Sequence, residues 1–272
     1  GEGEDVFLIR TDVSRSKLAN LSKELKDNLE RIHGENTVTV ERVEMVGPKV
    51  GKDLRQKALL AIYYALLLIA IYISWRFEQK LMPAAIMAGA LFLGVLGLRE
   101  VGMSIPMLIV AALVITMVCC WFLKLKYALG AVSALIHDVM ITVGAFAIAN
   151  KEFDLTVVAA LLTIIGYSLN DTIIVFDRIR ENLRKGKRRE FAEVVNASIN
   201  QTLSRTILTS GTTLAVVTAL FILGGGVIHD FAFALIVGVL VGTYSSIFVA
   251  SPVLIAWETK FANTRVRATA KS

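Results

Sequence analysis

Three ionisable residues, Asp138, Asp171 and Arg205, lie inside or at the edge of stretches that are otherwise apolar. A charged side chain at the centre of a membrane costs about 2.5–3.5 kcal/mol or more, so such residues usually mark an ion or proton pathway. A carboxyl group withdrawn from water can bind and release a proton near neutral pH. The chemistry that these residue types predict is therefore proton relay, with Asp171 as the main candidate.

Asp171 lies about five residues before the end of the apolar stretch 155–176. Arg205 stands at the start of the next one, 206–228, and its guanidinium can pair with Asp171 when the carboxyl group is ionised. Polar residues around the two predict a supporting face, namely Asn170, Tyr167, Thr206, Thr209 and Ser210. Two alternatives remain open: Asp171 as a structural hydrogen bond between helices, and Arg205 as a side chain that only reaches the membrane surface.

Asp138 follows His137 near the middle of the stretch 127–149, where a proton relay and a structural polar contact are equally compatible with the sequence. No phosphate-binding loop, zinc-ligand spacing or nucleophile motif appears in the sequence. We therefore expect no enzymatic activity, no metal and no cofactor. The energy for any transport must come from a partner or from an ion gradient.

Apolar helices must position these residues. The chain has 272 residues, of which 55% are hydrophobic and 19% are charged, and the charges are concentrated between long apolar stretches. About 20 apolar residues in a helix cross the roughly 30 Å hydrocarbon layer. The sequence predicts seven such spans, at 58–75, 81–98, 104–123, 127–149, 155–176, 206–228 and 231–257. In the last span, Ala234, Gly238, Gly242 and Ser246 form a stripe of small residues that predicts close helix packing.

The loops between the spans predict an orientation. Basic residues concentrate on the cytoplasmic side of membrane proteins, and alternate loops of this chain carry fifteen Lys and Arg against two. The basic loop 177–205 and the tail 258–272 are then cytoplasmic, and 1–57 lies outside. The pI is about 9.3, and we interpret the basic residues behind it as a signal for membrane orientation. We therefore expect the lipid membrane and no nucleic acid as a partner.

The N-terminal segment 1–57 has a different pattern. Residues 6–11 and 37–44 alternate like strands, and Leu18, Leu21, Leu25, Leu29 and Ile32 between them recur at helical spacing after a cap at Ser14 or Ser16. This order predicts half of a ferredoxin-like α+β domain. The expected fold class is thus an all-α membrane bundle over 58–257 with a small α+β half-domain at its N-terminus. An exported segment of this kind also implies a further span upstream, so the chain is expected to be a fragment.

Three segments resemble the SecF branch of the SecD/SecF family, within the resistance-nodulation-division superfamily. They are 46–51 (VGPKVG), 134–142 (ALIHDVMIT) and 166–184 (GYSLNDTIIVFDRIRENLR), the last followed by 201–206 and 209–213. The resemblance implies a subunit of the bacterial inner membrane that works with a SecD-like subunit. It implies that the pair uses the proton-motive force to assist export of unfolded polypeptides through the SecYEG translocon. It also implies roles in proton conduction for Asp171 and Arg205.

The spans 81–98 and 104–123 depart from the family pattern, in which the residues matching 76–78 lead almost directly to the His-Asp span. Two other functions remain as alternatives: a proton-driven efflux permease of the same superfamily, and a structural translocase subunit that conducts no protons. Replacing Asp171 by Asn separates the conducting subunit from the structural one. Drug sensitivity of a deletion strain with intact secretion would indicate the permease.

Overall fold

The computed structural model describes residues 18–34, 48–78, 81–151, 154–185 and 190–269. The chain divides into two compact units, Gly1–Gln56 and Lys57–Ser272, which are described separately. The described residues form ten helical elements. They are α1 (Leu18–His33), α2 (Pro48–Glu78), α3 (Leu81–Glu100), α4 (Ile105–Phe122), α5 (Lys126–Ile148), α6 (Leu155–Arg184), α7 (Phe191–Leu223), α8 (Gly226–Ser245), the π-helical turn η2 (Ser246–Ala250) and α9 (Ser251–Thr269).

The first unit corrects the expected fold class. Its helix α1 forms where the leucine spacing predicts it, but Ile32, the last residue of the proposed apolar face, is 74% exposed. The described residues contain no strand, and the predicted strands 6–11 and 37–44 lie outside them. Alternating residues favour a strand only where a paired sheet exists, and two short strands alone are marginally stable. The prediction of an α+β ferredoxin-like half-domain was therefore wrong, and the described fold is all-helical.

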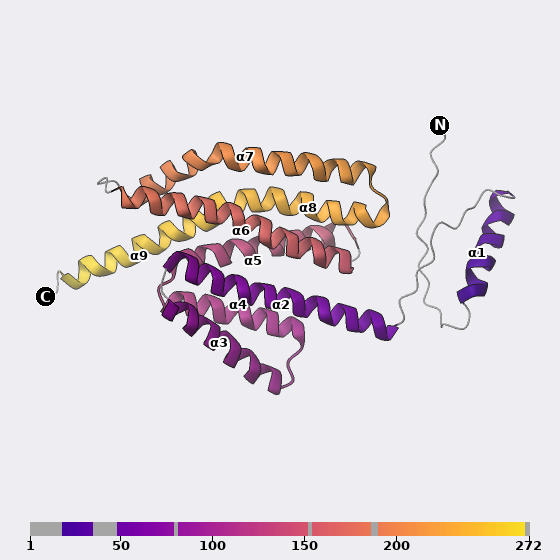
Figure 1. Cartoon of the computed structure of the whole chain (residues 1–272), viewed down its shortest axis with the longest axis horizontal. Coiled ribbons are helices and arrows are strands. Elements are labelled where there is room, and N and C mark those ends of the chain that lie inside the picture. The colour runs from indigo at the N-terminus through magenta and orange to yellow at the C-terminus, as the bar shows by residue number, and fades with distance from the viewer. Residues whose placement is uncertain (1–17, 35–47, 79–80, 152–153, 186–189, 270–272) are drawn as a thin grey trace. The chain divides into compact units, whose positions relative to one another are not determined.

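Seven helices are long and apolar enough to cross a membrane, the number that the sequence predicts. The last of these runs without a break through α8, η2 and α9, from Ile228 to Lys260. Figure 1 shows the helices of the second unit lying roughly side by side, with α7 along one side of the bundle and the α3–α4 pair along the other. Large apolar side chains are exposed on the bundle surface, among them Leu68, Phe92, Val110 and Leu208. Such a surface suits lipid rather than water.

Two helices extend beyond their apolar stretches. The helix α6 continues to Arg184 and α7 begins at Phe191, so most of the predicted loop 177–205 is helical. The two ends are joined by Asn182, whose side-chain amide donates to Ser198 at 2.8 Å and to Gln201 at 3.0 Å. Hydropathy marks the apolar part of a helix, whereas these amphipathic ends continue because Arg, Glu and Leu also favour helix.

The core of the second unit includes a cluster of aromatic rings between α2, α5 and α6. Phe77 stacks on Tyr127 with ring centroids 5.3 Å apart, and Phe176 meets both rings edge-on. The additional helices α3 and α4 pack against each other, and α4 also packs against α5. The buried face of α4 is a four-residue repeat of Leu108, Ala112, Thr116 and Cys120.

The helix α8 packs most extensively against α6 and α7. Two glycines of the predicted small-residue stripe make the approach to α6 possible. A Cβ at Gly238 would collide with the Ile164 side chain, and one at Gly242 would lie 2.9 Å from the Cβ of Ser168. The stripe therefore does bring helices together closely, as small residues do in membrane proteins.

Candidate functional site

Asp138 lies at the meeting point of three helices and is 1% exposed. Its Oδ2 atom accepts a hydrogen bond from the Ser168 hydroxyl on α6 and another, of 2.8 Å, from the Ser245 hydroxyl on α8. The ring nitrogen Nδ1 of His137 lies 3.0 Å from Oδ1. Both carboxylate oxygens of Asp138 are therefore partnered, which is what a buried carboxylate requires to remain stable.

The local structure of α8 explains these contacts. Gly242 lets the α8 backbone approach Ser168, and Ser245 follows less than one helical turn later on the same side. Ser245 is also the last residue before the π-helical turn η2, where the helix takes a wider ring of backbone hydrogen bonds. Such turns occur often at functional sites.

Asp171, on α6, is also 1% exposed but has far less support. Among the described residues its one side-chain hydrogen-bond partner is the Ser210 hydroxyl of α7, which donates to Oδ2 over 3.4 Å. The Thr243 hydroxyl of α8 lies 2.7 Å from that of Ser210. Asp171 thus has one long hydrogen bond, whereas Asp138 has three contacts. Keeping charge on a buried carboxylate with so few donors is costly.

The two carboxylates lie in two hydrogen-bonded groups that share the helices α6 and α8, and we call these groups together the polar layer. The helix α6 contributes Ser168 to the first group and Asp171 to the second, three residues apart and so on one helix face. The helix α8 likewise contributes Ser245 to the first and Thr243 to the second. A change at either carboxylate therefore bears on the packing of α6 against α8.

Arg205 lies on α7 and is exposed. Within the part of the chain that the structure describes, its guanidinium makes no ion pair, so the predicted contact with Asp171 is not formed here. Arg205 is adjacent to Thr206, which is buried on the α7 face that also carries Ser210.

The predicted supporting residues differ in burial and in their hydrogen bonds. Asn170 and Thr209 are exposed, and among the described residues neither side chain hydrogen-bonds to Asp138 or Asp171. Tyr167 is half-buried, and its hydroxyl donates to Thr213 at 3.3 Å. Thr206 and Ser210 are buried, and the Thr206 hydroxyl oxygen has no hydrogen-bond partner among the described residues.

Sequence reasoning missed Ser168, Thr243 and Ser245, which supply the hydroxyls of the polar layer. Ser168 carries one usable signal, since it precedes Asp171 by three residues in a helix. Ser245 follows the small-residue stripe by a similar step from Gly242. Among the described residues no group of three or more His, Cys, Asp or Glu is arranged to hold a metal ion.

These observations define the class of protein. Seven apolar helices around a buried layer of two carboxylates and several hydroxyls make this a multi-pass membrane protein with an ionisable core. The family model described as "Protein export membrane protein SecD/SecF, C-terminal" matches residues 25–103 and 96–260. The two matched stretches overlap at 96–103, near the turn between α3 and α4. The chain belongs to the SecD/SecF family.

Similar proteins carry names from the same family. A protein translocase subunit SecF from Desulfurispirillum indicum is 44% identical over 240 residues, which cover 87% of this chain and 62% of that protein. A protein translocase subunit SecF from Rhodothermus marinus is 41% identical, over 99% of this chain and 74% of that protein. A crystal structure of SecDF in a super-membrane-facing form matches with a TM-score of 0.53 and 43% identity, over 62% of this chain and 23% of that one. The chain spans about three fifths of the length of the first of these relatives.

Proposed function

We propose that the chain is the membrane part of a SecF-type subunit that uses the proton-motive force to assist protein export. Membership of the SecD/SecF family and the names of its relatives support this assignment. A SecD-like subunit is the partner that the similarity to SecDF favours. SecYEG and the unfolded polypeptides that cross it follow as further partners, and the bacterial inner membrane as the location.

The orientation proposed for the chain follows the basic residues. The ends of α6 and α7 that meet at 185–190 lie on the cytoplasmic side, as does the C-terminal segment after residue 257. Residues 1–57 then lie in the periplasm. Two basic residues at the ends of α2 and α6 support this orientation, because Arg76 contacts Asp177, the neighbour of Arg178, so that both residues belong to the same end of the bundle.

One observation carries the proposed mechanism: Asp171 is buried in an apolar bundle, and within the described part of the chain its side chain has one hydrogen bond, of 3.4 Å. A carboxylate in this setting gains little from its surroundings when charged. Proton binding therefore removes a large cost, and proton release restores an attraction to Arg205. Asp138, with both oxygens partnered, holds α5, α6 and α8 together.

Protonation of Asp171 would then alter the contact between α6 and α7. An ionised Asp171 attracts the Ser210 hydroxyl and the Arg205 guanidinium, both on α7, whereas the protonated group donates a hydrogen bond instead of only accepting. Such a change shifts the relative stability of two packings of the same helices. Movement of α7 against α6 is the step that we propose passes energy from the proton gradient to the translocase. The chain performs this coupling without catalysing a covalent reaction.

The test replaces Asp171 by Asn, which keeps the shape of the side chain and removes its ionisable proton. Export driven by the proton gradient after the ATP-dependent step should be lost, while the amount of protein in the membrane is unchanged. The matched control is Asp154→Asn on the same helix. Asp154 caps the start of α6 by accepting from the Val157 amide at 2.9 Å, and Asn caps a helix almost as well.

Two results would contradict the proposal. If Asp171→Asn leaves gradient-dependent export intact, the chain stabilises a translocase and does not conduct protons. If the variant changes sensitivity to small toxic molecules while secretion remains normal, the chain belongs to an efflux permease.

A further inference from the structure

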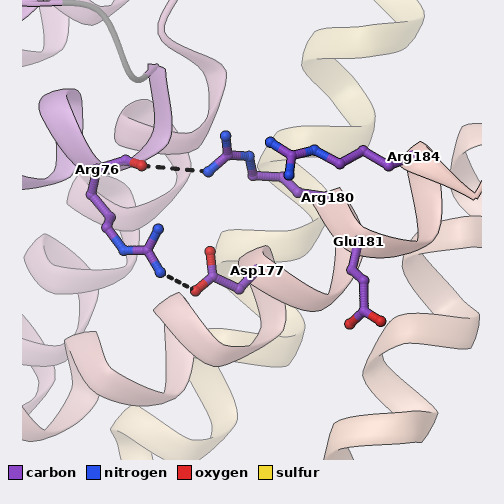
Figure 2. Close-up of a pocket in the computed structure, with 5 residues that line it drawn as sticks. All are labelled: Arg76, Asp177, Arg180, Glu181 and Arg184. Atoms are coloured by element: carbon purple, nitrogen blue, oxygen red, sulfur yellow. Dashed lines mark hydrogen bonds and ion pairs between the residues drawn. The ribbon is translucent and has the colours of Figure 1, made fainter.

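A pocket of about 170 Å³ opens between the ends of α2 and α6, away from the buried carboxylates. It is lined by Arg76, Asp177, Arg180, Glu181 and Arg184, and we call it the arginine pocket. Figure 2 shows the side chains of Arg180 and Arg184 extending from α6 toward Arg76. Three arginine side chains thus line one small pocket.

The two carboxylates of the arginine pocket are already partnered. Asp177 accepts from the Arg76 guanidinium at 2.6 Å. Glu181 is paired with Arg178 at 2.6 Å and with Lys185 at 2.8 Å, and neither of these cations lines the pocket. The negative charges of Asp177 and Glu181 are therefore balanced by cations other than Arg180 and Arg184.

Arg180 and Arg184 have no carboxylate partner among the described residues. Arg180 is held in place by other contacts, since it donates to the Arg76 carbonyl over 3.4 Å and lies 5.7 Å from the centre of the Phe77 ring. Holding cations together without a counter-charge is unfavourable. The pocket therefore matches an anion, and guanidinium groups match the oxygens of a phosphate especially well.

The position of the pocket indicates which phosphate it meets. Arg76 stands at the end of the apolar stretch of α2, and Asp177 stands directly after that of α6. Tyr72 and Trp75, in the last apolar turn of α2, are 40% and 52% exposed. Exposed Tyr and Trp at a helix end are typical of the level of lipid headgroups. Basic pockets between helices at this level suit anionic headgroups.

We propose that the arginine pocket binds the phosphate group of an anionic phospholipid. The lipid phosphate contacts Arg180 and Arg184 and reaches Arg76, and its acyl chains lie along the exposed apolar surface of α2 near Trp75. The bound lipid would join the end of α2 to the end of α6, next to the Arg76–Asp177 ion pair. This site does not depend on proton conduction by Asp171.

The experiment measures phosphatidylglycerol and phosphatidylcholine binding to the purified full chain in detergent by native mass spectrometry. Phosphatidylglycerol should bind more tightly than phosphatidylcholine. Replacing Arg184 by Gln should weaken phosphatidylglycerol binding about fivefold, the usual effect of one basic residue near anionic lipid. Arg184 is exposed and makes no hydrogen bond or ion pair with another described residue, so its loss should leave the fold intact. Arg180→Gln provides a second variant with the same expected direction.

The matched control is Lys185→Gln. Lys185 is next to Arg184 on α6, and its loss removes the same charge, but it does not line the pocket and Glu181 keeps its contact with Arg178. Lipid binding should change less than twofold in this variant. An equal loss in Lys185→Gln and Arg184→Gln would show only diffuse attraction to basic residues and would overturn the proposal. Equal binding of the two lipids, or displacement of phosphatidylglycerol by inorganic phosphate, would also overturn it.

Discussion

Asp138 and Ser245 are 107 residues apart in the sequence and are joined by a buried hydrogen bond of 2.8 Å. The bond connects α5 to the end of α8, next to the π-helical turn η2. The same carboxylate oxygen accepts from Ser168 on α6, so one atom links three helices. Asp138 therefore has a clear structural role in the bundle, whatever its part in proton transfer.

Replacing Ser245 by Ala should destabilise the protein. The change removes a donor to a buried carboxylate, and leaving such a group poorly partnered costs about 1–3 kcal/mol. The free energy of unfolding can be measured by titration with a denaturing detergent. The control is Ser74→Ala, because Ser74 is equally buried but its hydroxyl bonds to Ala70 in its own helix. Equal losses in the two variants would show that the contact with Asp138 adds nothing.

Gly238→Ala should also destabilise the protein, by about 1–3 kcal/mol, because overpacking forces side chains or backbone to move. A methyl group at this position would meet the branched Ile164 side chain, which has little freedom in a helix. The control is Gly211→Ala on α7, where nothing lies within 4 Å of the added carbon. That change should be neutral or slightly stabilising, since Ala favours helix over Gly. Thermal unfolding in detergent would separate the two, and equal melting temperatures would contradict the packing account.

The sequence revealed the two buried carboxylates because a charge inside an apolar stretch is visible without any structure. It could not reveal Ser168 and Ser245 as their partners. A serine is common on many helix faces, and its meaning depends on which helix lies opposite, a choice fixed here by Gly242. The sequence also placed Arg205 near Asp171 but could not fix whether the side chains touch.

The number of apolar helices was predictable because it depends on length and hydropathy alone. The ends of the helices were less predictable from hydropathy. The helix α6 continues to Arg184 and α7 begins at Phe191, because their amphipathic ends extend past the apolar part. The N-terminal α+β domain was predicted from alternation at 6–11 and 37–44, a pattern that cannot show whether the strands find a sheet. In the described residues of that segment no strand is present.

The ion pair between Arg76 and Asp177 should contribute little to stability. The two groups are 2.6 Å apart, but their side chains are 38% and 37% exposed, and such pairs are usually worth about 0.2–1 kcal/mol. A double-mutant cycle with Arg76→Gln and Asp177→Asn should give a coupling energy in this range. The pair of Arg178 and Glu181, also at 2.6 Å and within one helix, is the control. A coupling energy well above this range would mean that the pair is more shielded from water than its exposure indicates.

Arg205 should matter through its charge rather than through a fixed contact, because among the described residues its guanidinium makes no ion pair with Asp171. Arg205→Gln should remove most gradient-dependent export, whereas Arg205→Lys should retain much of it. If Arg205 acts only on Asp171, combining Arg205→Gln with Asp171→Asn should be no worse than Asp171→Asn alone, since residues that act as a unit are not additive. Arg178→Gln, which removes a charge from the end of α6, is the control and should export normally. Additive losses in the double variant, or normal export by Arg205→Gln, would place Arg205 outside the proton pathway and leave it as a side chain that reaches the membrane surface.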